Sequence, residues 1–165
     1  MAKTSDDLVI IPALLTDAPV ILDLQKLAYQ SEAALNDDYS IPPLTQTLPE
    51  WEADFQRQVY LKATRDGTIV GAVRGYEQNG TCFIGRLIVH PDCQNRGIGT
   101  QLLRGVEAHF NATQRYELFT SERSTRNLYL YHKLGYHIFR TEPLTAKVTI
   151  VYLEKMNQRD QRDNG

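Results

Sequence analysis

The residue spacing with the most definite chemistry lies where a strand-like run, residues 87–90, gives way to a helical pattern at Ile98–Phe110. Gly97 and Gly99 stand at the opening of that helix. Amide groups at a helix start lack intrahelical acceptors and carry the positive end of the helix dipole. Glycines have no Cβ that would hold a ligand away, so the pattern predicts a phosphate-binding turn, to which Arg96 can add a charged contact.

Two common phosphate-binding strings do not fit this turn. No Gly-x-x-x-x-Gly-Lys-Ser/Thr string occurs in the chain, and the third residue after Gly99 is Leu102 rather than the glycine of a dinucleotide fingerprint. The remaining alternative to a phosphate site is that the two glycines only form a tight turn.

The strands before this turn form an antiparallel meander. A first strand begins in Leu8–Leu15 and ends near Pro12, and β-rich runs follow at Val59–Thr64, Thr68–Gly75 and Cys82–His90. Asp-Gly at positions 66–67 and Asn-Gly at 79–80 separate the last three runs, and both dipeptides are hairpin signals.

After the turn the order becomes strand, helix, strand. A strand at Arg115–Thr120 follows the helix through a short connection, so it should lie parallel to the strand before the turn. A helix at Thr125–Leu134 and strands at Tyr136–Thr141 and Lys147–Leu153 complete this half.

The N-terminal half supplies the other helices. A helix runs from a cap at Thr16 or Asp17 to about Leu35, and a shorter one lies near Glu50–Gln56. Between them Asn36–Pro49 is predicted to be a surface loop, because prolines at 42 and 43 exclude a regular helix.

Composition bounds the function. The 165 residues suit one domain, predicted at 1–156, followed by a polar, disordered tail at 157–165. A net charge of −2 argues against nucleic acid as a partner, and no apolar run is long enough to span a membrane. Cys82 and Cys93 show no zinc-site spacing, so no metal is expected and both are predicted to be reduced thiols in a cytoplasmic protein.

The string Gln94-x-x-Gly97-x-Gly99 resembles the Gln/Arg-x-x-Gly-x-Gly/Ala signature of GNAT acetyltransferases, and Leu87, Val89 and Pro91 match the strand before it. The predicted order of elements is also similar to that family from about Leu8 to Glu154. The resemblance implies an α/β (α+β) fold with a mixed sheet of about seven strands. It further implies an antiparallel N-terminal meander, a splayed parallel central pair and about four flanking helices.

The same resemblance implies that the turn binds the pyrophosphate of acetyl-CoA, with no metal. The backbone of the preceding strand would pair with the pantetheine amides, whereas the side chains of Leu87 and Ile88 are predicted to belong to the core. The implied cofactor-binding residues are Leu87, Ile88, Val89, Gln94, Asn95, Arg96, Gly97, Ile98, Gly99, Thr100, Asn127 and Tyr131.

Tyr131 matches the family tyrosine that faces the thioester sulfur. A phenol with a pKa of ~10 stays protonated at neutral pH and can donate to a departing thiolate, whose thiol has a pKa of ~8.5. The alternative is that Tyr131 only packs in the protein, as we predict for Tyr129 and Tyr136. Asn127 resembles a residue that hydrogen-bonds the cofactor, with a plain solvent-facing position as its alternative.

The base that deprotonates the amine is not evident, because the strand Thr81–Val89 lacks the glutamate that some family members use. Glu122, Glu77 and His90 are candidates, and each has a solvated surface position as its alternative. A chain of water molecules could do the same work.

The acceptor site is implied to involve the loop around Asp37, Asp38 and Tyr39, which would suit a cationic amine. The resemblance therefore favours an N-acetyltransferase acting on the primary amine of a small molecule in a ternary complex. A protein or peptide acetyltransferase and a non-catalytic acyl-CoA-binding module are the alternatives. A homodimer is common in the family.

Overall fold

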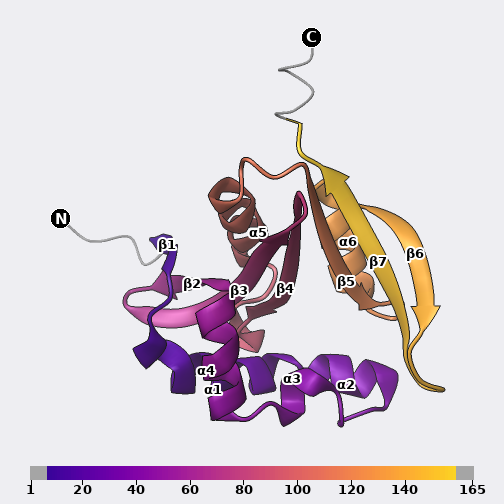
Figure 1. Ribbon diagram of the computed structural model, residues 1–165. Coiled ribbons are helices and arrows are strands. Elements are labelled where there is room, and N and C mark those ends of the chain that lie inside the picture. Colours follow the sequence, from indigo (N-terminus) through magenta and orange to yellow (C-terminus); the bar gives the residue numbers. More distant parts are fainter. Residues whose placement is uncertain (1–6, 159–165) are drawn as a thin grey trace.

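The computed structural model describes residues 7–158, so most of the predicted tail at 157–165 lies outside the described residues. Seven strands form one mixed sheet with the order β1-β2-β3-β4-β5-β7-β6. Helices cover both faces of the sheet and its lower end (Figure 1). The mixed sheet of seven strands with flanking helices confirms the fold class predicted from the sequence.

The N-terminal half of the sheet is the expected meander of β1 (Leu8–Pro12), β2 (Val59–Arg65), β3 (Thr68–Gln78) and β4 (Thr81–Val89), each antiparallel to the next. The β2–β3 turn has positive φ at Asp66 and Gly67, and the β3–β4 turn has it at Asn79 and Gly80. Two consecutive residues with positive φ are what a tight two-residue hairpin needs, and this is why the two dipeptides predicted the turns correctly.

The central pair, β4 and β5 (Arg115–Ser121), is parallel, as expected, but it pairs at only three positions, from Thr81↔Arg115 to Phe83↔Glu117. Beyond Phe83 the strands diverge toward the bottom of the sheet (Figure 1). The divergence begins next to a β-bulge, where two residues of β4, Arg86 and Leu87, oppose one residue of β3.

The other half of the sheet is β5, β7 (Thr149–Met156) and β6 (His137–Pro143), with β7 antiparallel to both neighbours. β6 forms the edge of the sheet, and every residue of it is exposed.

Two long helices follow the central strands, α5 (Ile98–His109) and α6 (Thr125–Lys133). The apolar residues predicted for the inner face of α5 are buried, and Leu102, Leu103 and Val106 have no exposed surface. On the opposite side, α1 (Ala18–Ala28) and α4 (Leu48–Arg57) pack around a fully buried Trp51, and α2 (Gln30–Asn36) continues α1 after Tyr29.

The prediction of a loop throughout Asn36–Pro49 was wrong at one point, because Pro42–Thr45 forms a short helix, α3. Pro42 and Pro43 occupy its first turn, where the missing N–H groups have no intrahelical role. Prolines therefore start this helix rather than exclude it.

Cys82 and Cys93 are free thiols, and Cys82 is buried. Within residues 7–158 no cluster of His, Cys, Asp or Glu side chains could hold a metal ion. No helix in that part of the chain is long and apolar enough to cross a membrane.

The packing of α5 can be tested with two substitutions of the same chemistry. Leu102→Ala removes a fully buried side chain, so we expect it to lower the free energy of unfolding by about 2–5 kcal/mol. Leu27→Ala, at a half-exposed position of α1, should change it by less than about 1 kcal/mol. Urea titration followed by circular dichroism measures both, and equal effects would contradict the assignment of the core.

Candidate active site

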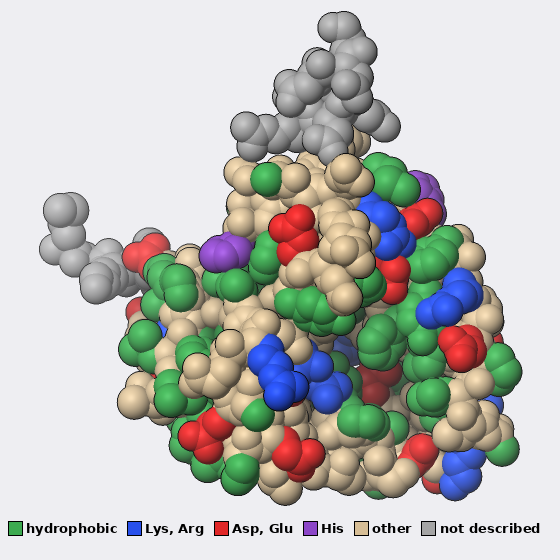
Figure 2. Space-filling model, in the orientation of Figure 1, with side chains coloured by type: hydrophobic (Ala, Val, Ile, Leu, Met, Phe, Trp, Pro, Cys, Tyr) green, Lys and Arg blue, Asp and Glu red, His purple; other side chains and the backbone are tan. Residues whose placement is uncertain are grey.

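A cavity of about 600 Å³ lies between the divergent parts of β4 and β5 and above the short helices α2 and α3. Figure 2 shows a hollow in this face of the molecule, with basic, acidic and apolar side chains around it. The residues that line the cavity come from the α1–α3 region, the second half of β4 with the following turn and the start of α5, β5, and α6, together with Arg74 of β3 and with the β6–β7 loop and β7.

The turn between β4 and α5 has the geometry of an anion cradle. Gly97 is the N-cap of α5 with φ +81°, and Asn95 before it also has positive φ. The first intrahelical bond is from the Gln101 amide to the Gly97 carbonyl at 3.1 Å, so the amides of Ile98, Gly99 and Thr100 lack intrahelical acceptors. A Cβ at Gly97 would meet nothing within 4 Å, which leaves space for a phosphate.

Gly99 has a different role from Gly97. A Cβ at Gly99 would lie 3.1 Å from the Cδ2 atom of Leu130 on α6, so this glycine allows α5 and α6 to approach closely. The start of the helix that follows the cradle therefore lies against Leu130, next to Tyr131 on α6.

Charged and polar side chains lie beside the cradle, but one of the side chains predicted from the sequence does not. The Arg126 guanidinium hydrogen-bonds the Gln94 side-chain oxygen, and both residues line the cavity. Arg96 is exposed and does not line it, although the sequence pointed to Arg96. Arg126 was missed because it lies on α6, and only the packing of α5 against α6 brings it to the turn.

The second half of β4 forms one wall of the cavity. Its β5 pairing ends at Phe83, so the strand edge at Leu87–Val89 faces the cavity without a neighbouring strand. The Ile88 side chain is buried and the Leu87 side chain packs against the core, as predicted. The backbone is thus the part of this strand that can offer hydrogen bonds to an extended ligand.

Tyr131 lines the cavity from α6 and is only 5% exposed. Burial raises the pKa of its phenol, and the neighbouring Tyr29 and Glu32 raise it further. The hydroxyl forms no hydrogen bond with any residue in the described part of the chain, 7–158. The phenol therefore keeps its proton at neutral pH and is available to a ligand.

The other two tyrosines of the segment differ from each other. Tyr136 is fully buried and donates to the Glu107 carboxylate at 2.6 Å, so the prediction that it packs in the core is confirmed. The same prediction was wrong for Tyr129, which is 71% exposed on α6 and borders the cavity.

Glu32 is the carboxylate that the sequence analysis missed. It lines the cavity from α2, accepts from the Ser124 hydroxyl at 2.7 Å, and lies 3.5 Å from the Asn127 amide nitrogen. Asn127 also donates to the Thr120 hydroxyl at 3.2 Å, so its side chain belongs to the cavity rather than to solvent. No sequence signal marks Glu32, since its partners lie about 90 positions later.

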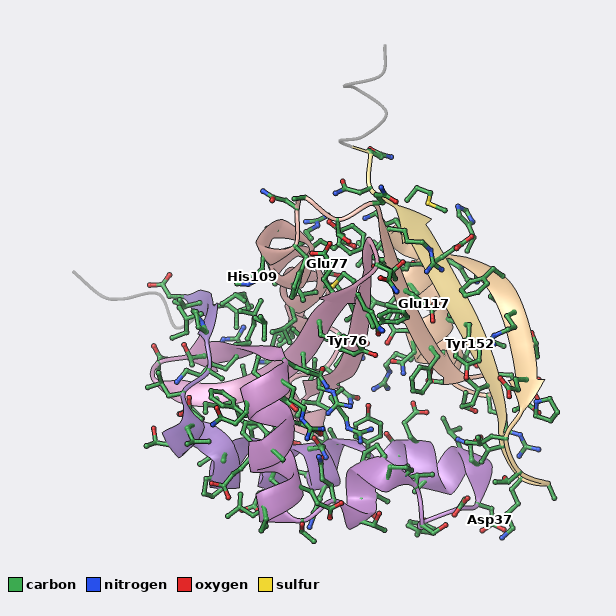
Figure 3. The ribbon with its side chains drawn as sticks, viewed as in Figure 1. Asp37, Tyr76, Glu77, His109, Glu117 and Tyr152 are labelled. Carbon is green, nitrogen blue, oxygen red and sulfur yellow. The ribbon has the colours of Figure 1, made fainter. Side chains whose placement is uncertain are left out.

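The candidate bases from the sequence lie elsewhere. Glu122 is exposed and does not line the cavity. Glu77 is exposed on β3, at the end of the sheet far from α2 (Figure 3). The His90 ring accepts from the Asp92 amide at 3.1 Å and does not line the cavity either.

Asp37, Asp38 and Tyr39 also lie outside the cavity lining. Asp37 instead holds the β6–β7 loop, because the Lys147 ammonium donates to its carbonyl at 3.1 Å and lies 3.7 Å from its carboxylate. Asp37 stands at the far lower end of the molecule in Figure 3.

A sheet split between two parallel strands, with a glycine-rich helix start at the split, defines an α/β protein built to hold an extended ligand with a phosphate group. The sequence profile of the acetyltransferase (GNAT) family matches residues 21–136, and the chain belongs to this family. The family and the fold indicated by the sequence are thereby confirmed.

One curated protein is similar in sequence. The UPF0157 protein YqkA of Bacillus subtilis (strain 168) is 32% identical over 122 residues, which are 73% of this chain and 35% of that protein. The chain thus spans about a third of the length of this curated relative.

Solved structures share the fold. PaiA N-acetyltransferase from Thermoplasma acidophilum, in complex with coenzyme A, superposes with a TM-score of 0.75 at 16% identity, over 91% of this chain and 99% of that chain. YncA, a putative acetyltransferase from Salmonella typhimurium with acetyl-CoA, gives 0.70 at 16% identity, over 92% and 94%.

The cradle can be tested against a matched glycine. Gly97→Ala and Gly67→Ala each place a methyl group at positive φ with nothing within 4 Å, so each should cost about 1 kcal/mol in backbone strain. Only Gly97 borders the cavity, so only Gly97→Ala should weaken coenzyme A binding, by about tenfold or more, in isothermal titration calorimetry. Equal affinities of the two variants would contradict the cradle.

Proposed function

We propose that the protein is an N-acetyltransferase that moves the acetyl group of acetyl-CoA to the primary amine of a small molecule, by direct attack in a ternary complex. One observation carries the proposal: a single cavity is bordered by the glycine turn, the open edge of β4, the phenol of Tyr131 and the carboxylate of Glu32. Membership of the acetyltransferase family supports the acetyl donor.

Acetyl-CoA supplies an activated thioester to this cavity. The free amides of Ile98, Gly99 and Thr100 would bind its phosphates, aided by the guanidinium of Arg126. The backbone at Leu87 and Val89 would pair with the amide groups of the pantetheine arm, which then takes the place of a neighbouring strand. These contacts direct the thioester toward Tyr131.

Tyr131 acts as the general acid. Its buried phenol holds a proton that no group in residues 7–158 accepts in a hydrogen bond. When the C–S bond breaks, negative charge develops on sulfur, and the phenol donates its proton there. Asn127 positions Glu32 and α6 rather than the cofactor, because its amide already donates to Thr120 and lies near Glu32.

Glu32 acts as the base in place of Glu122. An ammonium group has no lone pair, so the acceptor must lose a proton before it attacks, and the carboxylate in the cavity can attract the ammonium and accept that proton. The Ser124 hydroxyl holds this carboxylate in one orientation.

The closed side of the cavity favours a small acceptor over a protein. Three contacts tie the α2 region to distant strands and to α6: Ser121 to Asn36 at 2.6 Å, Ser124 to Glu32 at 2.7 Å, and Lys147 to Asp37. A protein chain would have to break these contacts to bring its amine to Glu32.

Tyr131→Phe tests the acid. We expect turnover with acetyl-CoA and any accepted amine to fall about a hundredfold or more, while the calorimetric affinity for coenzyme A stays the same. Tyr76→Phe, at an exposed position of β3 that does not line the cavity, is the control and should keep full turnover. Release of free thiol across a panel of amines measures the rate, and unchanged turnover of Tyr131→Phe would remove the assignment.

Glu32→Gln tests the base against the exposed alternative. It keeps the hydrogen bond from Ser124 but cannot accept the proton, so the rate should fall about a hundredfold at pH 7. Glu122→Gln should leave the rate unchanged, because that side chain does not line the cavity. A loss of rate in Glu122→Gln alone would reverse the two assignments.

A further inference from the structure

Arg86 occupies an unusual backbone position at the centre of the cavity wall. It is the first residue of the β4 bulge and has φ +48°, a left-handed conformation that costs a non-glycine residue about 1 kcal/mol or more. The bulge turns the strand at this point, and the Arg86 side chain lines the cavity. Strain of this kind persists where the rest of the structure holds it, and it is common in binding sites.

The Arg86 cation has no matching anion in the described chain, 7–158. Its Nε atom is buried without a hydrogen-bond acceptor, and its guanidinium forms no ion pair. Burial lowers the pKa of Arg86, and the nearby Arg74 cation lowers it further, against the opposite effect of the Tyr29 hydroxyl. An arginine remains charged at neutral pH even so, and a buried, unpaired cation is costly.

The carboxylate of Asp54, whose charge acts on Arg86, is already engaged. Asp54 pairs with Arg74 at 2.8 Å, and the same oxygen accepts from the Gln46 amide at 2.8 Å. Gln46 in turn accepts from the buried Gln25 at 2.9 Å, so this network is fixed. No ion pair joins Arg86 to Asp54 or to Glu32, the carboxylate that lines the cavity, so within residues 7–158 the Arg86 cation has no paired carboxylate.

We infer that the acceptor amine carries an anionic oxygen group, a carboxylate or a phosphate, and that the guanidinium of Arg86 binds this group. The inference rests on the proposed acetyl transfer and names the class of its acceptor. An arginine fork matches both kinds of oxyanion, and the two arms of the test below distinguish them. This acceptor differs from the purely cationic amine that Asp37, Asp38 and Tyr39 suggested in the sequence.

The positions of Glu32 and Arg86 suit a zwitterion. Tyr29 lines the cavity with them, and the charges of Arg86 and Glu32 both act on the pKa of its phenol. An α-amino acid bound across Tyr29 would place its ammonium at Glu32, beside Tyr131, and its carboxylate at Arg86. The amine would then lie at the thioester end of the cavity, where the acetyl group is transferred.

The test compares amines that differ only in the anionic group. A panel of L-amino acids is assayed beside their carboxamides and decarboxylated amines, and aminoalkylphosphonates form a separate arm. We expect acetylation of one of the two anionic series. Its kcat/KM should be about tenfold to a hundredfold above that of the counterparts that lack the anionic group. The series that responds identifies the anion as carboxylate or phosphate.

Arg86→Gln then removes the charge and keeps much of the side chain. It should raise KM for the amine with the anionic group about tenfold or more. KM for acetyl-CoA, and the rate with amines that lack this group, should stay the same. Arg65→Gln is the matched control, because Arg65 also has a buried Nε without an acceptor but lies at the β2–β3 turn, outside the cavity. It should change none of these values.

Two further measurements separate the possible failures. Thermal unfolding of Arg86→Gln should match or exceed that of the wild type, because an unpaired cation is removed, and a large loss of stability would indicate a structural role instead. Calorimetric binding of the same anions to protein saturated with coenzyme A should depend on Arg86 even if no amine is acetylated. The inference would be overturned if only amines without an anionic group were acetylated, or if Arg86→Gln left anion binding unaffected. Anion binding without turnover would overturn only the proposed function.

Discussion

The separation of β4 from β5 is the constraint on which the rest of the molecule depends. A parallel ladder that stops after three residue pairs leaves one edge of β4, the edge that faces β5, without a partner strand from Ile84 onward, while the other edge stays paired with β3. Buried peptide groups need hydrogen-bond partners, so such an edge is stable only beside water or a ligand that can act as a strand. The gap therefore suits a long, narrow ligand that carries amide groups along its length.

The two helices that follow the divergent strands then bring the chemistry to one place. α5 begins at the end of β4 and α6 begins just after β5, and the contact of Gly99 with Leu130 sets the distance between them. A larger residue at position 99 would displace the Leu130 side chain, which neighbours Tyr131 on α6. The glycine signature thus encodes two separate demands, positive φ at Gly97 and close helix packing at Gly99.

Sequence patterns predicted those parts of the protein that depend on neighbours in the chain. The hairpins at Asp66-Gly67 and Asn79-Gly80, the inner face of α5 and the glycine turn all rest on residues within a few positions of each other. Glu32 and Arg126 could not be found in this way, because their partners come from Ser124 and Gln94 through tertiary packing. Pro42 and Pro43 misled for a related reason: a proline excludes the interior of a helix but suits its start, and the sequence alone did not show where α3 starts.

The charges of the cavity follow from the same geometry. The β4 bulge lies three residues beyond Phe83, where the β4–β5 ladder ends, and Arg86 in this bulge has a left-handed backbone and lines the cavity. The opening for the cofactor and the positive charge for the acceptor therefore lie on the same part of β4. Glu32 comes from a different element, α2, which hydrogen bonds from Ser121 and Ser124 hold against β5 and the start of α6. The cation on the sheet and the anion on the covering helix place opposite charges on two sides of the cavity. These charges orient a zwitterionic amine before any bond is made.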